Sequence, residues 1–334
     1  MSGRNKVTIE DISRETGLSR GTISRALNDR PDISAETKAR VLAAVKKLNY
    51  VPSTTARSLA TGRHFAVVVF VADLSDSFSA EFLRGVLIQA ELARYFVNVV
   101  ELGATEALAD RIARLNLERL DGALLCSHIS SPELAQLSEK LEGRLAVAAF
   151  PCVEVGHDSI VPDHAQSGRL VAEHLLGGGR REIAYLHDSA VPFSKERLAG
   201  FSEVSGASGV DSSAAIINVN SASSAAEIAN ALRARGPGLS GVAATNDELA
   251  VSALVALVSL GRQPGRDITV VGQGNAAFAR GIAPQLSSTD LHAVDIGRRS
   301  MEMLVSRLCK TRTDATQLVA IEPHLEVRAS SKPL

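Results

Sequence analysis

The sequence predicts a small all-α domain at the N-terminus and a larger α/β body with two doubly wound parallel-sheet subdomains. Three observations lead to this prediction. A chain of 334 residues is long enough for two or three compact domains. Residues 1–63 have short helical patterns separated by a tight turn, whereas the remainder alternates between apolar runs and helical segments. The net charge changes sign at the same boundary.

The charge distribution separates the two parts. Residues 1–63 contain 12 lysines and arginines and 6 acidic residues, which gives a net charge of +6. The remaining residues contain 24 basic and 31 acidic residues, which gives −7. A compact basic domain on an acidic body favours a polyanionic partner for the basic part. A solvated basic face without any ligand would have the same charge.

Composition excludes several protein classes. The three cysteines, Cys126, Cys152 and Cys309, are widely spaced, which indicates a reducing compartment rather than a disulfide framework or a zinc site. The longest apolar run, 65–72, is too short to span a bilayer, and the N-terminus lacks a secretory signal. We therefore expect a cytoplasmic protein without a membrane partner. Aromatic residues make up only 4% of the chain, so few rings are available for a stacking pocket.

The first helix and the turn have clear end signals. Thr8 and Asp11 have the spacing of a capping box, which predicts a helix that runs to about Thr16. Gly17 can adopt the positive φ of a tight turn.

Two further helices follow. Ser19 is the expected N-cap of a second helix over 20–27, and Ser34 that of a third helix through Leu48. Apolar residues recur at helical spacing, and we expect a core of Val7, Ile12, Leu18, Ile23, Leu27, Val41, Leu42, Val45 and Leu48. The outer face of the second helix then presents Arg20, Gly21, Ser24, Arg25 and Asn28.

This arrangement predicts a DNA-binding helix-turn-helix headpiece. A tight turn makes the second helix protrude, and a protruding helix fits the major groove. Arginine can form a bidentate contact to guanine, and Ser/Thr hydroxyls suit phosphates. A three-helix protein-binding module is the alternative.

Residues 7–62 resemble the headpiece and hinge of the LacI/GalR family of bacterial transcription repressors at essentially every position. The resemblance implies that Thr8 contacts phosphate. It also implies that Gly21 leaves out a base-reading side chain that the family usually carries, so Arg20 and Arg25 should account for most direct readout. The implied DNA-binding set is Thr8, Ser19, Arg20, Gly21, Thr22, Ser24, Arg25, Asn28 and Tyr50, with Ala56 and Leu59 in the hinge.

The hinge segment, 53–61, is too short and too rich in Ser and Thr for a stable isolated helix. The resemblance implies that it folds in the minor groove, with Leu59 wedged between base steps and Ala56 allowing two hinge helices to approach. An inserted apolar wedge kinks the duplex. Without the resemblance, an ordinary interdomain linker would be the preferred interpretation.

The body has two series of predicted strands. The first is 65–72, 96–102, 122–126 and 145–150, and the second is 183–186, 216–219, 241–244 and 268–271. Continuous Val/Ile/Leu/Ala runs between helices are typical of parallel sheets covered on both faces. We expect a ligand at the carboxyl ends of the strands, in the cleft between the two subdomains.

The stretches EFLRGV, LDGALL, ERLAGF, TNDELAVSALVAL and DITVVG resemble the regulatory domain of the same family, which is similar to a periplasmic sugar-binding protein. The resemblance implies crossings between subdomains near residue 160, near 290 and near the C-terminus. The expected domains are the headpiece 1–52, the hinge 53–62, a first effector-binding subdomain of 63–160 plus 291–322, and a second of 161–290 plus 323–334.

Family positions also imply an effector pocket. Its predicted residues are Asp76, Phe78, Asp163, Phe193, Arg197, Asn246 and Gly274. Helix capping is the simpler role for Asp76 and Asn246, and a turn for Asp163, whereas Arg197 supplies five donors in a fixed fork. Gly274 replaces a frequent aspartate, and an aromatic residue is missing near Asn220, so a stacked pyranose is disfavoured. We expect a small polar effector, a sugar or a sugar acid.

Other motifs carry less weight. Residues 272–277 match a dinucleotide fingerprint, G-x-G-x-x-A, without a following βαβ unit, and 177–179 fit a helix end better than a phosphate loop. The eight histidines have no metal-site spacing, and no catalytic arrangement is recognisable. We expect no enzyme activity, no cofactor and no metal.

The sequence thus predicts a homodimeric regulator, a repressor that binds a near-palindromic operator and responds to a cleft ligand. The final residues contain no heptads, which favours a dimer over a tetramer. The alternatives are a solute-binding protein of a sugar-transport system and a nucleotide-dependent dehydrogenase.

Overall fold

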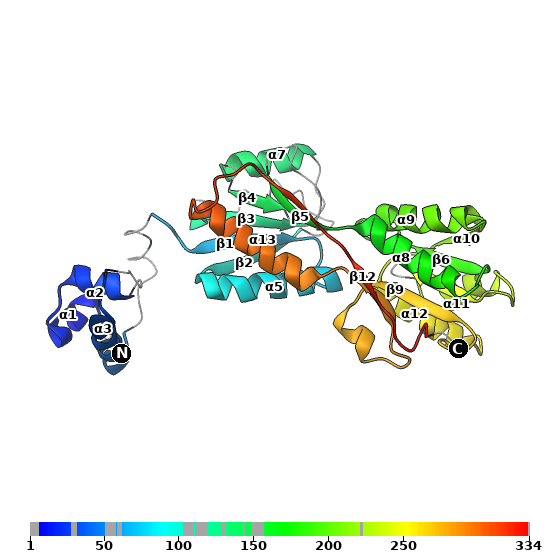
Figure 1. Cartoon of the computed structure of the whole chain (residues 1–334), viewed down its shortest axis with the longest axis horizontal. Coiled ribbons are helices and arrows are strands. Elements are labelled where there is room, and N and C mark those ends of the chain that lie inside the picture. Colours follow the sequence, from blue (N-terminus) through cyan, green and yellow to red (C-terminus); the bar gives the residue numbers. More distant parts are fainter. Residues whose placement is uncertain are drawn as a thin grey trace. The chain divides into compact units, whose positions relative to one another are not determined.

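The computed structural model describes residues 7–27, 32–50, 58, 62–102, 110, 119–127, 131–142, 144–147, 157–220 and 223–332 (Figure 1). The chain divides into two compact units, Met1–His64 and Phe65–Leu334.

The N-terminal unit contains the three predicted helices, α1 (Ile9–Thr16), α2 (Arg20–Leu27) and α3 (Ala35–Leu48). Gly17 ends α1 with φ 67°, a left-handed conformation that glycine adopts without a steric penalty. The Ser34 hydroxyl accepts a hydrogen bond from the Thr37 amide at the start of α3. The predicted end signals are therefore confirmed.

The three helices enclose a small core. Ile12, Ile23 and Val41 are fully buried, with Ala26 and Ala44 between them. The prediction for Leu42 was wrong: its side chain is 47% exposed. One residue along a helix turns the side chain by about 100°, so Val41 and Leu42 cannot both face the same narrow core.

The first sheet of the body has the strand order β11-β5-β4-β3-β1-β2, all parallel. Helices α5 (Ser77–Ala93), α7 (Ser131–Lys140) and α13 (Ala293–Leu308) belong to this half, and α13 packs on α5. The strands are β1 (Ala66–Val71), β2 (Phe96–Glu101), β3 (Gly122–Cys126), β4 (Leu145–Val147), β5 (Asp158–Pro162) and β11 (Leu318–Ile321).

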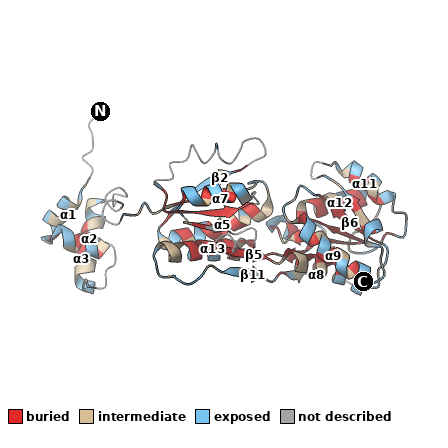
Figure 2. Ribbon diagram, turned by 90° about the horizontal axis from the view of Figure 1, so that it is seen from above, coloured by how far each residue is buried: buried red, intermediate tan, exposed pale blue. Residues whose placement is uncertain are grey.

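The second sheet has the order β12-β10-β9-β8-β6-β7. Its strands are β6 (Ile183–His187), β7 (Ile216–Asn218), β8 (Gly241–Ala244), β9 (Thr269–Gly274), β10 (Ser287–Asp290) and β12 (His324–Glu326). The helices of this half are α8 (His164–Gly177), α9 (Ser194–Ala207), α10 (Ser212–Ala215), α11 (Ala225–Arg233), α12 (Asp247–Ser259) and the short 3₁₀ helix η3 (Ala277–Arg280). Burial is concentrated in the central strands of both sheets, as the red ribbons of Figure 2 show.

The chain passes between the two sheets three times: from β5 to α8, from β10 to α13, and from β11 to β12 (Figure 1). These three crossings place the carboxyl ends of the strands of both sheets around one cleft.

Four strands at these crossings, β5, β10, β11 and β12, were not predicted as strands. β10 has the sequence SSTD, and its first three side chains are fully buried although they are polar. β12 pairs antiparallel with β10, which departs from the all-parallel prediction for the second sheet.

The glycine-rich segments have structural roles. Helix α8 ends at Gly177, as predicted, and Gly179 has φ 76°. Gly274 has φ 134° at the end of β9, and only the four-residue η3 follows it. A dinucleotide site needs a longer helix whose N-terminus faces the phosphates, so this loop does not form one.

Among the described residues, every helix is too short or too polar to cross a membrane.

Candidate functional site

Helix α2 presents a polar, basic surface. Arg20, Gly21 and Arg25 are exposed, whereas Thr22 and Ser24 are partly buried. Arg20 forms an ion pair with Glu10 (2.6 Å), and Arg25 forms one with Asp32 (3.1 Å). Both pairs are largely solvated and hence weak, so either arginine can exchange its carboxylate for a guanine edge or a phosphate at little cost.

Capping side chains hold the ends of α1 and α2. The Asp11 carboxylate accepts hydrogen bonds from the amide and the hydroxyl of Thr8, both at 2.8 Å. These bonds hold the pKa of Asp11 below its ordinary value. The Ser19 hydroxyl accepts from the Thr22 amide at 3.1 Å and lies 2.9 Å from the Thr22 hydroxyl. Thr8 and Ser19 are exposed, so phosphate oxygens can reach them.

The predicted DNA-binding set contains five residues other than the polar and charged side chains at the starts of α1 and α2 and on the face of α2. The nearest atom to a Cβ built on Gly21 is 3.8 Å away, so space is not the reason for glycine there. Tyr50 is partly buried and packs against the core of the N-terminal unit. Asn28, Ala56 and Leu59 lie outside the described residues.

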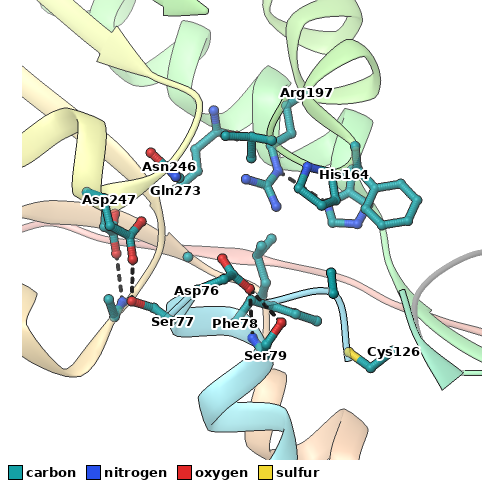
Figure 3. A pocket seen from close by; sticks show the side chains of 18 of the residues that line it. Asp76, Ser77, Phe78, Ser79, Cys126, His164, Arg197, Asn246, Asp247 and Gln273 are labelled. Carbon is teal, nitrogen blue, oxygen red and sulfur yellow. Dashed lines mark hydrogen bonds between the residues drawn. The ribbon is translucent and has the colours of Figure 1, made fainter. Parts of the chain in front are cut away.

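A pocket lies in the body where strands of both sheets end (Figure 3). The first half contributes residues that follow β1 and β3, and the second half contributes residues from α8, α9, α12 and β9. Of the seven predicted residues, six line the pocket: Asp76, Phe78, Phe193, Arg197, Asn246 and Gly274. Asp163 is not among the lining residues.

Arg197 is the central cation of the pocket. Its side chain is 5% exposed, and Nη1 donates to the Thr245 carbonyl at 2.6 Å. Nε lies 3.3 Å from Nδ1 of His164, whose ring stacks on Phe193 with centroids 4.5 Å apart. Burial, together with the charge of Arg197, lowers the pKa of His164 well below its ordinary value. His164 is therefore neutral, and its Nε2 is buried without a hydrogen-bond partner in the structure.

Asp247 is the buried acid of the pocket. Its carboxylate accepts hydrogen bonds from the Ser288 hydroxyl and the Ala276 amide, both at 2.6 Å. Burial nevertheless raises the pKa of Asp247 to about 6. Glu248, one residue further along α12, also lines the pocket.

Several predicted pocket residues cap helices as well. Asp76 accepts from the amide of Ser79 at 2.8 Å, and Asn246 accepts from the amide of Leu249 at 3.0 Å. Asp163 accepts from the Gln166 amide at 2.8 Å and thereby caps α8. Capping and pocket lining are thus combined at Asp76 and Asn246, whereas Asp163 caps α8 and pairs with Arg169 (3.7 Å) without lining the pocket.

The two halves touch across the pocket. The Ser77 hydroxyl of α5 donates a hydrogen bond to Glu248 of α12. The remaining cavity is about 50 Å³, far below the roughly 300–1,000 Å³ of small-molecule sites. A ligand of sugar size therefore requires the halves to separate or the lining side chains to move.

Some lining residues were absent from the predicted set, among them His164, Asp247, Glu248 and Gln273. The Gln273 amide donates to the Tyr185 hydroxyl and the Ala244 carbonyl, and its oxygen accepts from Ser167. The sequence signal for Gln273 was a lone polar side chain at the end of an apolar strand, which also fits an ordinary strand end. His164 and Asp247 directly follow the predicted residues Asp163 and Asn246 in the sequence.

Comparisons with known proteins agree with this architecture. A family model described as "Bacterial regulatory proteins, lacI family" matches residues 8–53, and one described as "Periplasmic binding protein-like domain" matches residues 172–331. The chain belongs to the LacI family. The predicted family and fold class are thereby confirmed, as a LacI-family helix-turn-helix followed by an α/β body.

A LacI-family relative matches over its whole length. The HTH-type transcriptional regulator CelR of Thermobifida fusca is 29% identical over 345 residues, which covers 99% of this chain and 100% of the relative. The chain is accordingly a transcriptional regulator and not an enzyme, which contradicts the dehydrogenase and solute-binding alternatives.

Two solved structures show the same fold. A complex of the transcriptional regulator CelR with cellobiose covers 97% of this chain and 99% of its own, with a TM-score of 0.69 and 24% identity. The Lac repressor dimer bound to operator and the anti-inducer ONPF covers 98% and 99%, with a TM-score of 0.76 and 21% identity.

Proposed function

We propose that this LacI-family chain is a repressor that binds a near-palindromic operator as a homodimer. A small polar ligand in the pocket of the body controls the operator affinity. In this proposal the domain boundaries are those predicted from the sequence, with a hinge at 53–62 between the headpiece and the body. The repressor acts in the cytoplasm, where its operator is found.

The main support for the proposed DNA binding is the exposed surface of α2. Its two arginines, Arg20 and Arg25, are held by solvated ion pairs, and Nε of Arg25 also donates a long hydrogen bond of 3.4 Å to the Gly21 carbonyl. The Ser19 hydroxyl and the amides of the first turn of α2 provide hydrogen-bonding groups beside them. Guanidinium groups next to short hydroxyl side chains suit a guanine edge and the adjoining phosphate.

The charge of the pocket favours a neutral ligand. Among the described residues that line it, three carry carboxyl groups, Asp76, Asp247 and Glu248, and one carries a guanidinium, Arg197. An anionic sugar acid would meet more negative than positive charge in a site of low dielectric constant. Carboxylates and a guanidinium together suit the hydroxyls of a neutral sugar, which both donate and accept hydrogen bonds. Cellobiose, the ligand in the CelR complex, belongs to this class.

The proposal is tested by selecting operator sequences from random duplex DNA with the full-length chain and titrating the best duplex. Arg20→Ala should weaken binding to that duplex by about 1–3 kcal/mol and leave binding to random DNA almost unchanged. A panel of neutral sugars in the same titration should include one that changes the operator affinity.

Lys47→Ala is the control for the loss of one positive charge. Lys47 lies on α3 and pairs with Glu15 (2.7 Å), away from the α2 surface. This variant should keep its preference for the selected duplex. The proposed role of α2 fails if Arg20→Ala retains full discrimination between selected and random duplexes.

A further inference from the structure

Three potential metal ligands meet where the chain crosses between the two halves of the body. Asp290 is the last residue of β10, and His324 is the first residue of β12. The two residues are paired in the antiparallel ladder, which places their side chains on the same side of the sheet. His292 lies two residues after Asp290 and is the N-cap residue of α13.

The separation of the two imidazole nitrogens fits a first-row divalent metal ion, and the Asp290 carboxylate would have to move closer to complete the site. One ligand atom from each of the three residues lies within 4.8 Å of the others. Nδ1 of His324 and Nε2 of His292 are 3.2 Å apart. Two nitrogens bound tetrahedrally to Zn²⁺ at about 2.0–2.1 Å would be separated by roughly 3.3–3.4 Å. The two rings therefore need almost no movement to share an ion.

A second layer of side chains orients the ligands. Nε2 of His324 lies 2.8 Å from a carboxylate oxygen of Glu326, which directs Nδ1 toward His292. The Asn275 amide donates to Asp290 at 2.9 Å and is itself held by Arg328. A carboxylate behind a histidine and a hydrogen bond to a ligating carboxylate are typical supports of metal sites.

Solvent can reach the cluster. His324 is exposed, and Asp290 and His292 are partly buried. The latter two also line an open surface pocket together with Glu81, Arg84 and Arg298. An ion could enter from this side and keep water as its remaining ligand.

We propose that Asp290, His292 and His324 bind a divalent transition-metal ion that braces the hinge of the body. Two imidazoles and one carboxylate suit Zn²⁺, Co²⁺ or Ni²⁺ better than Mg²⁺ or Ca²⁺, which prefer all-oxygen sites. The ligands come from two of the three crossings, β10 to α13 and β11 to β12. Binding therefore restrains the angle between the halves, and this inference does not depend on the identity of the cleft ligand.

The test is calorimetric titration of the full-length chain, without a histidine tag, with Zn²⁺. The wild type should bind one ion per chain at this site. His292→Gln and His324→Gln should each weaken that binding by about 100-fold or more, and Glu326→Gln by about 10–100-fold. Co²⁺ in place of Zn²⁺ should give the visible absorption band of nitrogen-ligated Co²⁺ in the wild type alone.

Cys309→Ser is the control, because Cys309 is an exposed thiol that could bind zinc elsewhere. It should leave the titration unchanged. A melting curve of each histidine variant without metal shows whether the variant is folded, so that a loss of binding can be separated from a loss of folding. Wild-type affinity in both histidine variants would overturn the site, as would the absence of binding in the wild type.

Hydrogen–deuterium exchange tests the bracing. Zn²⁺ should slow amide exchange in residues 287–293 and 322–326 of the wild type and have no such effect in His292→Gln. Bound Zn²⁺ with unchanged exchange in these segments would overturn the bracing.

Discussion

At the scale of single residues, Asp247 shows how burial in the pocket makes the ionisation of a carboxyl group unfavourable. The carboxyl group is almost completely buried, and two hydrogen bonds only partly compensate for its lost hydration. Gly272 makes room for it, because a Cβ there would come within 2.1 Å of its Oδ1. As a result, its pKa is raised from 3.8 to about 6.

This raised pKa predicts a pH dependence of stability. The folded state binds the Asp247 proton more tightly than the unfolded state does. The resulting stabilisation is fully present below the unfolded pKa of 3.8 and is lost as the pH rises through about 6. Between about pH 5 and pH 8, the wild type should lose about 1–2 kcal/mol of unfolding free energy relative to Asp247→Asn. Urea denaturation of both proteins at the two pH values measures this difference, and a constant difference would contradict the assignment.

At the scale of elements, paired glycines bring helices into close contact in both halves. A Cβ on Gly85 of α5 would lie 1.9 Å from a carbonyl oxygen of α13, and a Cβ on Gly297 of α13 would lie 2.0 Å from one of α5. Gly168 of α8 and Gly200 of α9 form the same kind of contact. The oxygen that faces Gly168 belongs to Arg197, so this contact also positions the central cation of the pocket.

Two alanine substitutions in α9 separate this packing effect from helix propensity. Gly200→Ala should destabilise the body by about 3 kcal/mol, because its Cβ would lie 1.9 Å from the Ala165 carbonyl oxygen. Gly206→Ala meets no atom within 4 Å and should stabilise by up to about 1 kcal/mol. Thermal unfolding compares the two variants. Equal melting temperatures would show that the close crossing is not required.

At the scale of the whole molecule, exposed apolar side chains support the proposed homodimer. Leu92 at the end of α5 is 74% exposed, and Phe96 on the edge strand β2 is 63% exposed. Further exposed apolar residues on the same two elements and on α12 are Leu87, Ile88, Val99, Val255 and Val258. Apolar surface of this kind on and beside a strand at the edge of the described sheet is typical of a subunit interface.

Disruption of this surface should change the oligomeric state. Leu92→Asp and Phe96→Asp should each convert the dimer into a monomer in sedimentation velocity, because an interface cannot bury an unpaired carboxylate without a large cost. Leu318→Asp is the matched control, since Leu318 is 49% exposed on β11 at the opposite edge of the same sheet. Dimeric behaviour of both α5–β2 variants would place the interface elsewhere.

The helices of the headpiece and the central strands of both sheets could be predicted from local sequence patterns alone. Their signals are local: Ser19 and Ser34 cap the helices they precede, and 122–126 is a continuous apolar run. Residues of this kind form the same hydrogen bonds in most contexts, so their sequence pattern is sufficient. The likeness of 7–62 to a known headpiece added the roles of the exposed side chains of α2.

The pairing of residues that are distant in the sequence could not be predicted, because it depends on how the elements pack. The polar strand β10 is buried because Ser288 donates to Asp247 and Thr289 bonds to Ser167, across separations of 41 and 122 residues. Asp163 caps a helix instead of lining the pocket, and His292 meets His324 although 32 residues separate them. A polar side chain is buried at low cost only when a partner is in place. That partner is supplied by packing between elements, which no local pattern encodes.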